Sequence, residues 1–255
     1  MPFFDAALAQ RALSLLDLTD LSDNADEVGL EALCAKAIST PGPVAAICIW
    51  PRFVAQARTI LGNSPVKIAT VVNFPSGDEP LPEVEQQIQG ALNAQADEID
   101  LVMPWKAFLH GDPEPARIMI KNARSVCGEA PTLKVILETG EYPDLDRVRE
   151  ASELAIAAGA DFIKTSTGKT AHSASLAAAR TMLKVIAATG RPVGLKPSGG
   201  IRSLADATGY LALADEIMGP GWARPETFRF GASGLHQVLV DVIGGAAVGQ
   251  ASGPY

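Results

Sequence analysis

Short apolar runs alternate with longer amphipathic segments along almost the whole chain. The short runs contain little polar alternation, which is typical of strands that are buried on both faces. In the longer segments, apolar residues recur every three to four positions, which predicts helices. The predicted strands cover residues 13–18, 44–50, 67–74, 98–103, 133–138, 162–167, 193–196 and 228–230, and the predicted helices cover residues 27–38, 83–94, 116–126, 145–158, 176–188 and 204–214.

Two details near the N-terminus qualify this pattern. The early part of the first apolar run is equally consistent with the end of an N-terminal helix. Ser22, Asp23 and Asn24 have the side chains that commonly cap helices, so we expect one of them to begin the helix over residues 27–38.

The repeat of strand and helix predicts the fold class. The strands recur about every 30 residues, and eight strand–helix units in 255 residues indicate an α/β protein with a (β/α)8 TIM barrel. An open doubly wound sheet is the alternative, but no Gly-x-Gly-x-x-Gly follows the first strand. No linker divides the chain, so we predict a single domain over residues 1–255 with a short N-terminal helix. Residues 244–255 are rich in Gly, Ala and Ser and are predicted to form a mobile tail.

Composition and charge exclude several classes of partner. Hydrophobic residues make up 47% of the chain and charged residues 20%, which is typical of a folded globular protein. A net charge of −8 argues against nucleic acid or an anionic membrane as the main partner, although a local basic cluster could still bind a small anion. The three cysteines, Cys34, Cys48 and Cys127, have no metal-type spacing and no secretory signal precedes them, so we expect reduced thiols and a cytoplasmic protein.

Lys164 is the first candidate for chemistry, because it follows Phe162 and Ile163 at the end of a predicted buried strand. Burial disfavours the charged form of lysine and lowers its pKa, and a neutral amine is a nucleophile for carbonyl groups. The alternative is that the side chain extends from the strand end to solvent and has no chemical role.

Other polar residues lie at the ends of neighbouring predicted strands. The carboxyl ends of the strands form the active-site face of a TIM barrel, so several of these side chains should enter one cavity. Lys196 would lie beside Lys164, and two close ammonium groups lower the pKa of one of them. A purely structural network of aspartate–lysine ion pairs is the alternative. The candidates at or near the strand ends are Asp17, Thr19, Cys48, Asn73, Asp100, Lys134, Glu138, Lys164, Thr165, Lys196 and Ser233.

Glycine clusters follow the last three predicted strands. They are Gly168 with Lys169, Gly199 and Gly200 with Arg202, and the segment 231–234, which includes Ser233 and Gly234. Phosphate sites in TIM barrels are commonly built from these last loops and from a helix N-terminus. Each cluster alone is an ordinary turn, but three in adjacent loops indicate a phosphate site. His110, His172 and His236 lack ligand spacing, and we predict no metal and no cofactor.

Motifs in order along nearly the whole chain resemble the 2-deoxyribose-5-phosphate aldolase family. The matching segments are residues 16–19, 46–53, 69–75, 97–100, 133–140, 159–169, 196–202 and 229–233. The resemblance implies a class I aldolase, which acts through a lysine Schiff base on a (β/α)8 barrel and needs no metal. It also implies that the substrates are a sugar phosphate and an aldehyde.

The resemblance also implies roles for individual residues. Lys164 matches the Schiff-base lysine, Lys196 the second lysine that lowers the pKa of the first, and Asp100 the aspartate of proton transfer. Asp17 resembles the support of the second lysine. The phosphate loops match at Gly168, Lys169, Gly199, Gly200, Arg202 and Ser233, although many family members have a second serine where Gly234 stands. Tyr255 matches the C-terminal tyrosine of some members and would be a mobile proton donor.

We therefore expect reversible cleavage of 2-deoxy-D-ribose 5-phosphate to acetaldehyde and D-glyceraldehyde 3-phosphate by a homo-oligomer, a dimer or a tetramer. Two alternatives remain open. One is another Schiff-base aldolase for a related sugar phosphate, and the other is a barrel that binds sugar phosphates without turnover.

Overall fold

The computed structural model describes residues 2–245, with side chains from residue 5 onward. Its eight strands are all parallel and form one sheet in the order β7-β6-β5-β4-β3-β2-β1-β8. Isolated parallel bridges, Leu195 with Phe228 and Ser198 with Gly231, join β7 to the β8 segment and close the ring. The strands are β1 (Leu16–Asp20), β2 (Ala46–Ile49), β3 (Lys67–Val72), β4 (Glu98–Val102), β5 (Thr132–Ile136), β6 (Phe162–Lys164), β7 (Gly194–Lys196) and β8 (Phe230–Ala232).

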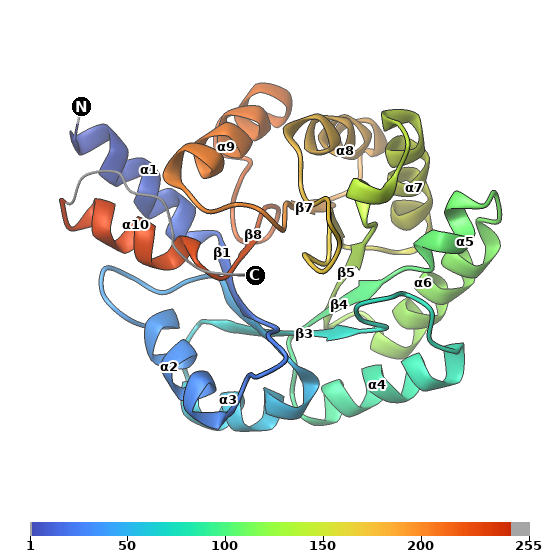
Figure 1. Cartoon of the computed structure of the whole chain (residues 1–255), viewed down its shortest axis with the longest axis horizontal. Helices are drawn as coiled ribbons and strands as arrows, with labels where there is room; N and C mark the ends of the chain where they lie inside the picture. Colours follow the sequence, from blue (N-terminus) through green and yellow to red (C-terminus); the bar gives the residue numbers. More distant parts are fainter. Residues whose placement is uncertain (1, 246–255) are drawn as a thin grey trace.

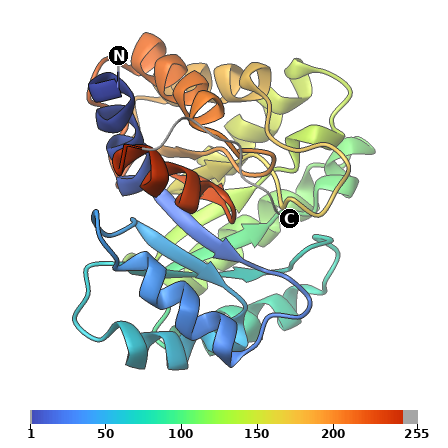
Figure 2. The same ribbon diagram turned by 60° about the vertical axis from the view of Figure 1, so that its left-hand side comes forward.

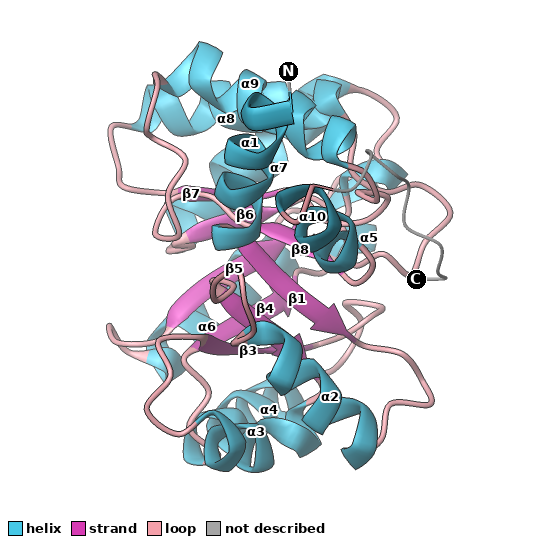
Figure 3. Ribbon diagram, turned by 90° about the vertical axis from the view of Figure 1, so that its left-hand side faces the viewer, coloured by secondary structure: helices cyan, strands magenta, loops and turns pink. Residues whose placement is uncertain are grey.

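Ten described helices surround this ring of strands (Figure 1), and in side view the strands lie between layers of helix (Figure 3). α1 and α10, from opposite ends of the described chain, pack side by side (Figure 2). The helices are α1 (Pro2–Ser14), α2 (Glu27–Ala37), α3 (Val54–Leu61), α4 (Leu81–Asn93), α5 (Trp105–Leu109), α6 (Glu114–Cys127), α7 (Leu145–Ala158), α8 (Leu176–Thr189), α9 (Leu204–Met218) and α10 (Leu235–Ile243), with short 3-10 turns at Pro51–Phe53 and Thr139–Glu141. The prediction of a TIM barrel is confirmed, and the doubly wound alternative is wrong.

Most element boundaries lie close to the predicted ones, and α7 coincides with the predicted helix 145–158. The first apolar run is divided, because α1 ends at Ser14 and β1 begins at Leu16. The last strand was predicted over residues 228–230 but begins at Phe230, because pairing with β1 starts there, whereas the segment before it forms a bridge to β7. The predicted cap of α2 was wrong: Asp26 is the N-cap and accepts a hydrogen bond from Gly29 N at 2.8 Å.

Alternation along the strands explains why charged groups occupy the barrel interior. Successive side chains of a strand point to opposite faces. On β4, Ile99 and Leu101 belong to the large apolar core between sheet and helices, whereas Val102 belongs to a small inner cluster. Glu98 and Asp100 share the face of Val102 and therefore point into the barrel. No described helix is both long and apolar enough to span a membrane.

Candidate active site

Seven ionisable side chains fill the interior of the barrel, and none is more than 5% exposed. Burying a charge is costly unless it is paired and hydrogen-bonded, so their mutual contacts decide whether this interior is stable. The seven residues are Asp17, Glu98, Asp100, Lys134, Lys164, Lys196 and Arg229.

Asp100 lies at the centre of this cluster and contacts three lysines. Its Oδ2 accepts hydrogen bonds from Lys164 Nζ at 2.7 Å and from Lys196 Nζ at 2.8 Å. Its Oδ1 accepts one from Lys134 Nζ at 3.0 Å. Burial alone would raise the pKa of Asp100, but the three ammonium groups hold it well below the usual value. The carboxylate is therefore ionised at neutral pH.

Lys164 and Lys196 are paired in the register of β6 and β7, yet their surroundings differ. Lys196 Nζ contacts Asp17 Oδ2 at 2.5 Å in addition to Asp100. Burial disfavours its charge, but the two carboxylates outweigh burial and raise the pKa of Lys196 well above the usual value. Among the described residues, Lys164 forms an ion pair with Asp100 alone. Burial, reinforced by the charge of Lys196, lowers the pKa of Lys164. Of the two lysines, Lys164 is thus the one that more readily becomes a neutral amine.

Glu98 and Arg229 complete the cluster on the side away from Lys164, and neither was predicted from the sequence to have a role. Arg229 donates from Nη1 to Asp17 Oδ1 at 2.6 Å and from Nη2 to Glu98 Oε1 at 2.7 Å. Lys134 Nζ donates to Glu98 Oε2 at 2.5 Å. Glu98 precedes Asp100 by two positions, so strand alternation could have indicated that both point inward. Nothing in the sequence indicates that Arg229 reaches Asp17.

Lys134 and Glu138 both belong to the strand predicted over residues 133–138, but the structure places only Lys134 in a strand. β5 ends at Ile136, and Glu138 has a left-handed backbone with φ of 60°. Its Oε2 accepts a hydrogen bond of 2.5 Å from Thr167 Oγ1. Lys134 instead contacts Asp17, Glu98 and Asp100.

A cavity of about 510 Å³ opens above Lys164. Lys164 is the member of the buried cluster that lines it, so a small molecule in the cavity meets the amine predicted to be neutral. Thr19, at the end of β1, was predicted to lie at this site. The loop after it contributes a wall that was not predicted, because Ser22, Asp23 and Asn24 were expected to cap α2. The lining residues are Thr19, Asp20, Leu21, Ser22, Asp23, Asn24, Lys164, Thr167, Lys169, Ser198 and Ser233.

The predicted supporting residues hold the strand ends in place. Thr19 Oγ1 donates to Asp17 O at 2.8 Å. Thr165 Oγ1 donates to Ser198 O at 3.1 Å and accepts from Ser198 N at 2.9 Å, so it ties the end of β6 to the segment after β7. Cys48 Sγ lies 4.0 Å from Asp100 Oδ2, and burial raises the pKa of this thiol, which stays protonated at neutral pH.

The structure brings several of the predicted phosphate-binding residues together. Lys169 and Ser233 line the cavity, and Lys169 Nζ lies 3.4 Å from Asp23 Oδ1. Gly168 and Gly199 have φ values of 78° and 90°, and a Cβ on Gly199 would lie 3.7 Å from Gly168 Cα and 2.6 Å from Ser173 Oγ, so these two loops pack closely.

The remaining predicted phosphate contacts lie around this group. Gly234 caps the N-terminus of α10, next to Ser233, where helix amides favour an anion. Gly200 has φ of 79° and follows Gly199 in the same turn. Arg202 is not among the lining residues; its side chain is exposed and its backbone N bonds Asp206 Oδ2 at 3.0 Å. Tyr255 lies outside the described residues.

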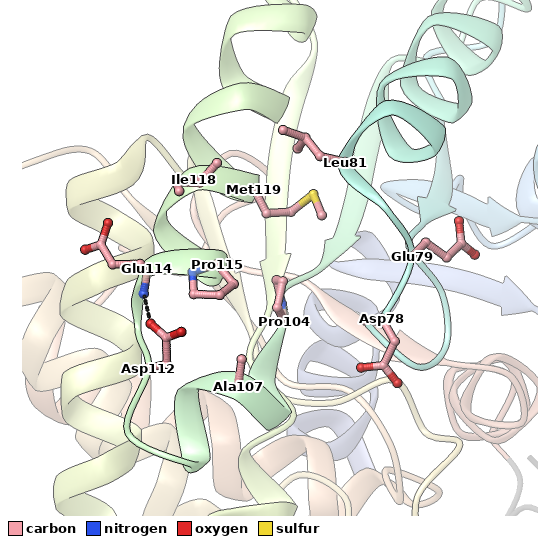
Figure 4. Close-up of a pocket in the computed structure, with 11 residues that line it drawn as sticks. Asp78, Glu79, Leu81, Pro104, Ala107, Asp112, Glu114, Pro115, Ile118 and Met119 are labelled. Carbon is pink, nitrogen blue, oxygen red and sulfur yellow. Dashed lines mark hydrogen bonds between the residues drawn. The ribbon is translucent and has the colours of Figure 1, made fainter.

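A second cavity of about 510 Å³ lies outside the barrel, among α4, α5 and α6 (Figure 4). Pro104, Ile118 and Met119 give it an apolar wall, and its charged lining residues are all carboxylates, among them Asp78 and Glu114. Because no lysine or arginine of residues 2–245 lines this second cavity, these residues do not fit a phosphate or Schiff-base chemistry there. The cavity above Lys164 is therefore the candidate active site.

Comparisons with known proteins identify the family of this chain. The model of the DeoC/LacD family aldolases matches residues 11–223. A deoxyribose-phosphate aldolase of Agrobacterium fabrum is 50% identical over 248 residues, which cover 97% of this chain and 96% of that protein. The tetrameric deoxyribose phosphate aldolase of Aeropyrum pernix has a similar fold, with a TM-score of 0.74 at 24% identity over 94% of this chain and 96% of that one. A Toxoplasma gondii structure, provisionally assigned to the same activity, has a TM-score of 0.88 at 24% identity over 97% of this chain and 98% of that one. The chain therefore belongs to the DeoC/LacD family of aldolases.

Proposed function

We propose that this chain is a deoxyribose-phosphate aldolase, which reversibly cleaves 2-deoxy-D-ribose 5-phosphate to acetaldehyde and D-glyceraldehyde 3-phosphate. The observation that carries the proposal is the buried Lys164 amine at the base of a cavity, bonded to the carboxylate that also binds Lys196. The Agrobacterium fabrum relative of that name supports the choice of substrate.

In the synthetic direction, Lys164 is the nucleophile. Its neutral Nζ attacks the carbonyl carbon of acetaldehyde, and the resulting carbinolamine loses water to give a protonated imine. The imine acidifies the adjacent methyl group, which loses a proton to give an enamine. The enamine carbon attacks the aldehyde of glyceraldehyde 3-phosphate, whose oxygen takes up a proton. Hydrolysis of the new imine releases the sugar phosphate and returns the free amine.

Asp100 and Lys196 exchange the protons of these steps. Asp100 Oδ2 lies 2.7 Å from Lys164 Nζ, so it can accept a proton beside the reacting carbon, directly or through a water molecule. Lys196 keeps its proton, because Asp17 and Asp100 stabilise its charge, and it stands ready as an acid at the same carboxylate. This pairing of a neutral and a charged lysine lets one cluster supply both a nucleophile and an acid.

Trapping of the imine tests this proposal. The protein is incubated with acetaldehyde and borohydride, digested, and its peptides are identified by mass spectrometry. We expect a reduced two-carbon adduct on Lys164. An adduct on Lys196 would reverse the roles of the lysines, and a folded protein without any adduct would contradict the aldolase assignment in favour of a binding barrel. A panel of related sugar phosphates then distinguishes the proposed substrate from others.

Replacement of Lys169 with methionine is expected to weaken binding of the phosphorylated substrate. Lys169 lines the cavity and its side chain is 28% exposed. Loss of its charge should raise KM for glyceraldehyde 3-phosphate about tenfold, the value of one charge-assisted contact. Steady-state kinetics with unphosphorylated glyceraldehyde is the control, and its KM should not change. An equal rise for both aldehydes would show that Lys169 does not contact phosphate.

Gly234 gives a second test of the same site, in the opposite direction. Its φ of −86° accepts any side chain, so Gly234→Ser adds a hydroxyl beside Ser233 without backbone strain. The variant should lower KM for the phosphorylated aldehyde, and an unchanged KM would count against a phosphate at the N-terminus of α10.

We also propose that the chain forms a homo-oligomer, a dimer or a tetramer, and acts in the cytoplasm. The tetramer described for the Aeropyrum pernix relative supports self-association, and three free buried thiols, Cys34, Cys48 and Cys127, suit a reducing compartment. Light scattering during size-exclusion chromatography checks the first statement, because a monomer at micromolar concentration would contradict it.

A further inference from the structure

We propose that Arg229 and Glu98 are positioning residues whose charges set how readily Lys164 gives up its proton, although neither touches Lys164 or lines its cavity. This inference rests on the proposed function, because it concerns the amine that forms the imine. It follows from the contacts inside the barrel and from a count of the buried charges.

The count shows that the cluster holds one more cation than anions. The anions are the carboxylates of Asp17, Glu98 and Asp100, and the cations are the side chains of Lys134, Lys164, Lys196 and Arg229. With every group ionised, the cluster carries one unpaired positive charge in a nearly water-free interior, which is costly. Release of one proton from a lysine removes that excess. The charges of the cluster therefore balance when three of the four basic side chains keep their protons and one lysine is neutral.

The contacts decide which cation loses its proton. Arg229 stays charged at any relevant pH, since the pKa of a guanidinium lies above the working range, and the carboxylates around Arg229 raise it further. Lys134 contacts all three carboxylates, Asp17 Oδ2 at 3.6 Å, Glu98 Oε2 at 2.5 Å and Asp100 Oδ1 at 3.0 Å. Lys196 contacts two carboxylates, whereas Lys164 contacts one. Lys164 is thus the least compensated of the lysines.

Arg229 and Glu98 act on this balance from the opposite end of the barrel. Both line a cavity of about 500 Å³ on the side of the strand N-termini, together with residues such as Ser14 and Thr132. Arg229 pairs with Asp17 and Glu98 and thereby occupies carboxylate oxygens that would otherwise stabilise lysine charges. Glu98 in turn holds Lys134 and Arg229 as cations. The two residues therefore push the pKa of Lys164 in opposite directions, Arg229 downward and Glu98 upward.

The ionisable groups that face Lys164 from the surrounding elements are all included in this balance. They are Asp17 from β1, Cys48 from β2, Asp100 from β4, Lys134 from β5, Glu138 from the loop after β5 and Lys196 from β7, with Asp20, Asp23 and Lys169 at the cavity wall. Cys48 is protonated and uncharged at neutral pH. Glu138 bonds Thr167 and lies outside the cluster, and its charge acts on Lys164 equally in the wild type and in both variants, so it does not affect the comparison between them.

The experiment measures how the rate of imine formation with acetaldehyde depends on pH. At each pH, the imine is reduced with a borohydride reagent, and the rate at which the reduced adduct appears on Lys164 is recorded in a single turnover. The rate should fall at low pH as Lys164 becomes protonated. Arg229→Gln removes the excess cation and should move this acidic limb up by about one pH unit, whereas Glu98→Gln adds to the excess and should move it down by about one unit. A purely structural role would lower the rate of both variants without opposite displacements.

The double variant Arg229→Gln with Glu98→Gln makes the test independent of folding losses in the single variants. It removes one cation and one anion, so the excess of one positive charge returns, and a neutral pair in place of a buried ion pair is often tolerated. We expect its acidic limb at the wild-type position. Arg180→Gln and Glu216→Gln are the matched controls, since these residues form an exposed ion pair of 2.6 Å between α8 and α9, and neither should move the limb.

Displacements of the two single variants in the same direction, or no displacement in folded variants, would overturn the inference while leaving the aldolase assignment intact. If the single variants do not fold, the double variant decides. A shift of the acidic limb of its pH–rate profile away from the wild-type position would also overturn the inference. A wild-type protein that forms no imine would instead contradict the proposed function, so the two failures are distinguishable.

Discussion

Replacement of Lys164 with methionine is expected to abolish aldol cleavage, with a loss in kcat/KM on the order of 10⁴-fold or more. Methionine fills a similar volume but has no amine, so no imine can form. Asp100 keeps two of its three lysine partners in the variant, Lys134 and Lys196. We therefore expect a folded protein without turnover, measured by the release of glyceraldehyde 3-phosphate in a coupled assay.

Lys184→Met is the matched control for this result. Lys184 is exposed on α8, so this substitution removes the same kind of amine from the surface and leaves the buried cluster unchanged. It should retain wild-type kinetics. Circular dichroism of both variants separates loss of chemistry from loss of fold. Near-native cleavage by a folded Lys164→Met protein would refute the Schiff-base assignment of this residue.

Replacement of Asp100 with asparagine is expected to damage both stability and catalysis. Asparagine keeps the shape but removes the charge that three buried ammonium groups share, and loss of one partner from a buried ionic cluster costs about 3–5 kcal/mol. Loss of a general acid–base group lowers kcat by about 10²–10⁴-fold. Urea denaturation at pH 7 measures the first effect, and steady-state kinetics in the absence of urea measures the second.

The stability difference between wild type and Asp100→Asn should depend on pH in a defined direction. In the folded protein the pKa of Asp100 lies well below the 3.8 of an ordinary aspartate, because the surrounding lysines outweigh burial. The ionised carboxylate therefore contributes its stability above about pH 4, and this contribution is lost as the pH falls toward the folded-state pKa. The difference should be largest near neutral pH and should narrow in acid. Asp241→Asn, an exposed change on α10, should show no such trend.

The parts of this protein that could be predicted from sequence are those that follow from the spacing of apolar residues within single strands and helices. Lys164, Lys196 and Asp100 were assigned to one cavity because parallel strands present their carboxyl ends on one face. α7 was predicted over its full length because apolar residues recur at helical spacing through residues 145–158, and the structure adds Asp144 as its side-chain cap and Gly159 as its C-cap. These signals lie within a few residues of the element that they define.

The parts that could not be predicted depend on contacts between distant residues. Arg229 and Asp17 are separated by 212 positions, and only the closure of the barrel brings them within 2.6 Å. The wall formed by Asp20 and Ser22 was missed for another reason: Asp20 Oδ1 accepts hydrogen bonds from Ser22 N and Oγ, and this local turn resembles a helix cap in sequence.

The seam of the barrel connects the charge of Lys196 to the closure of the ring. Strands β1 to β6 pair in continuous register with their sequence neighbours, whereas β7 meets the β8 segment only through two isolated bridges. Lys196 lies on the β7 side of that seam, and its Nζ reaches Asp17 on β1 across it at 2.5 Å. Arg229 lies on the other side, beside β8, which pairs directly with β1. A barrel whose seam is open would therefore lack the bond between Lys196 and Asp17, so the environment that keeps Lys196 charged exists only in the closed ring.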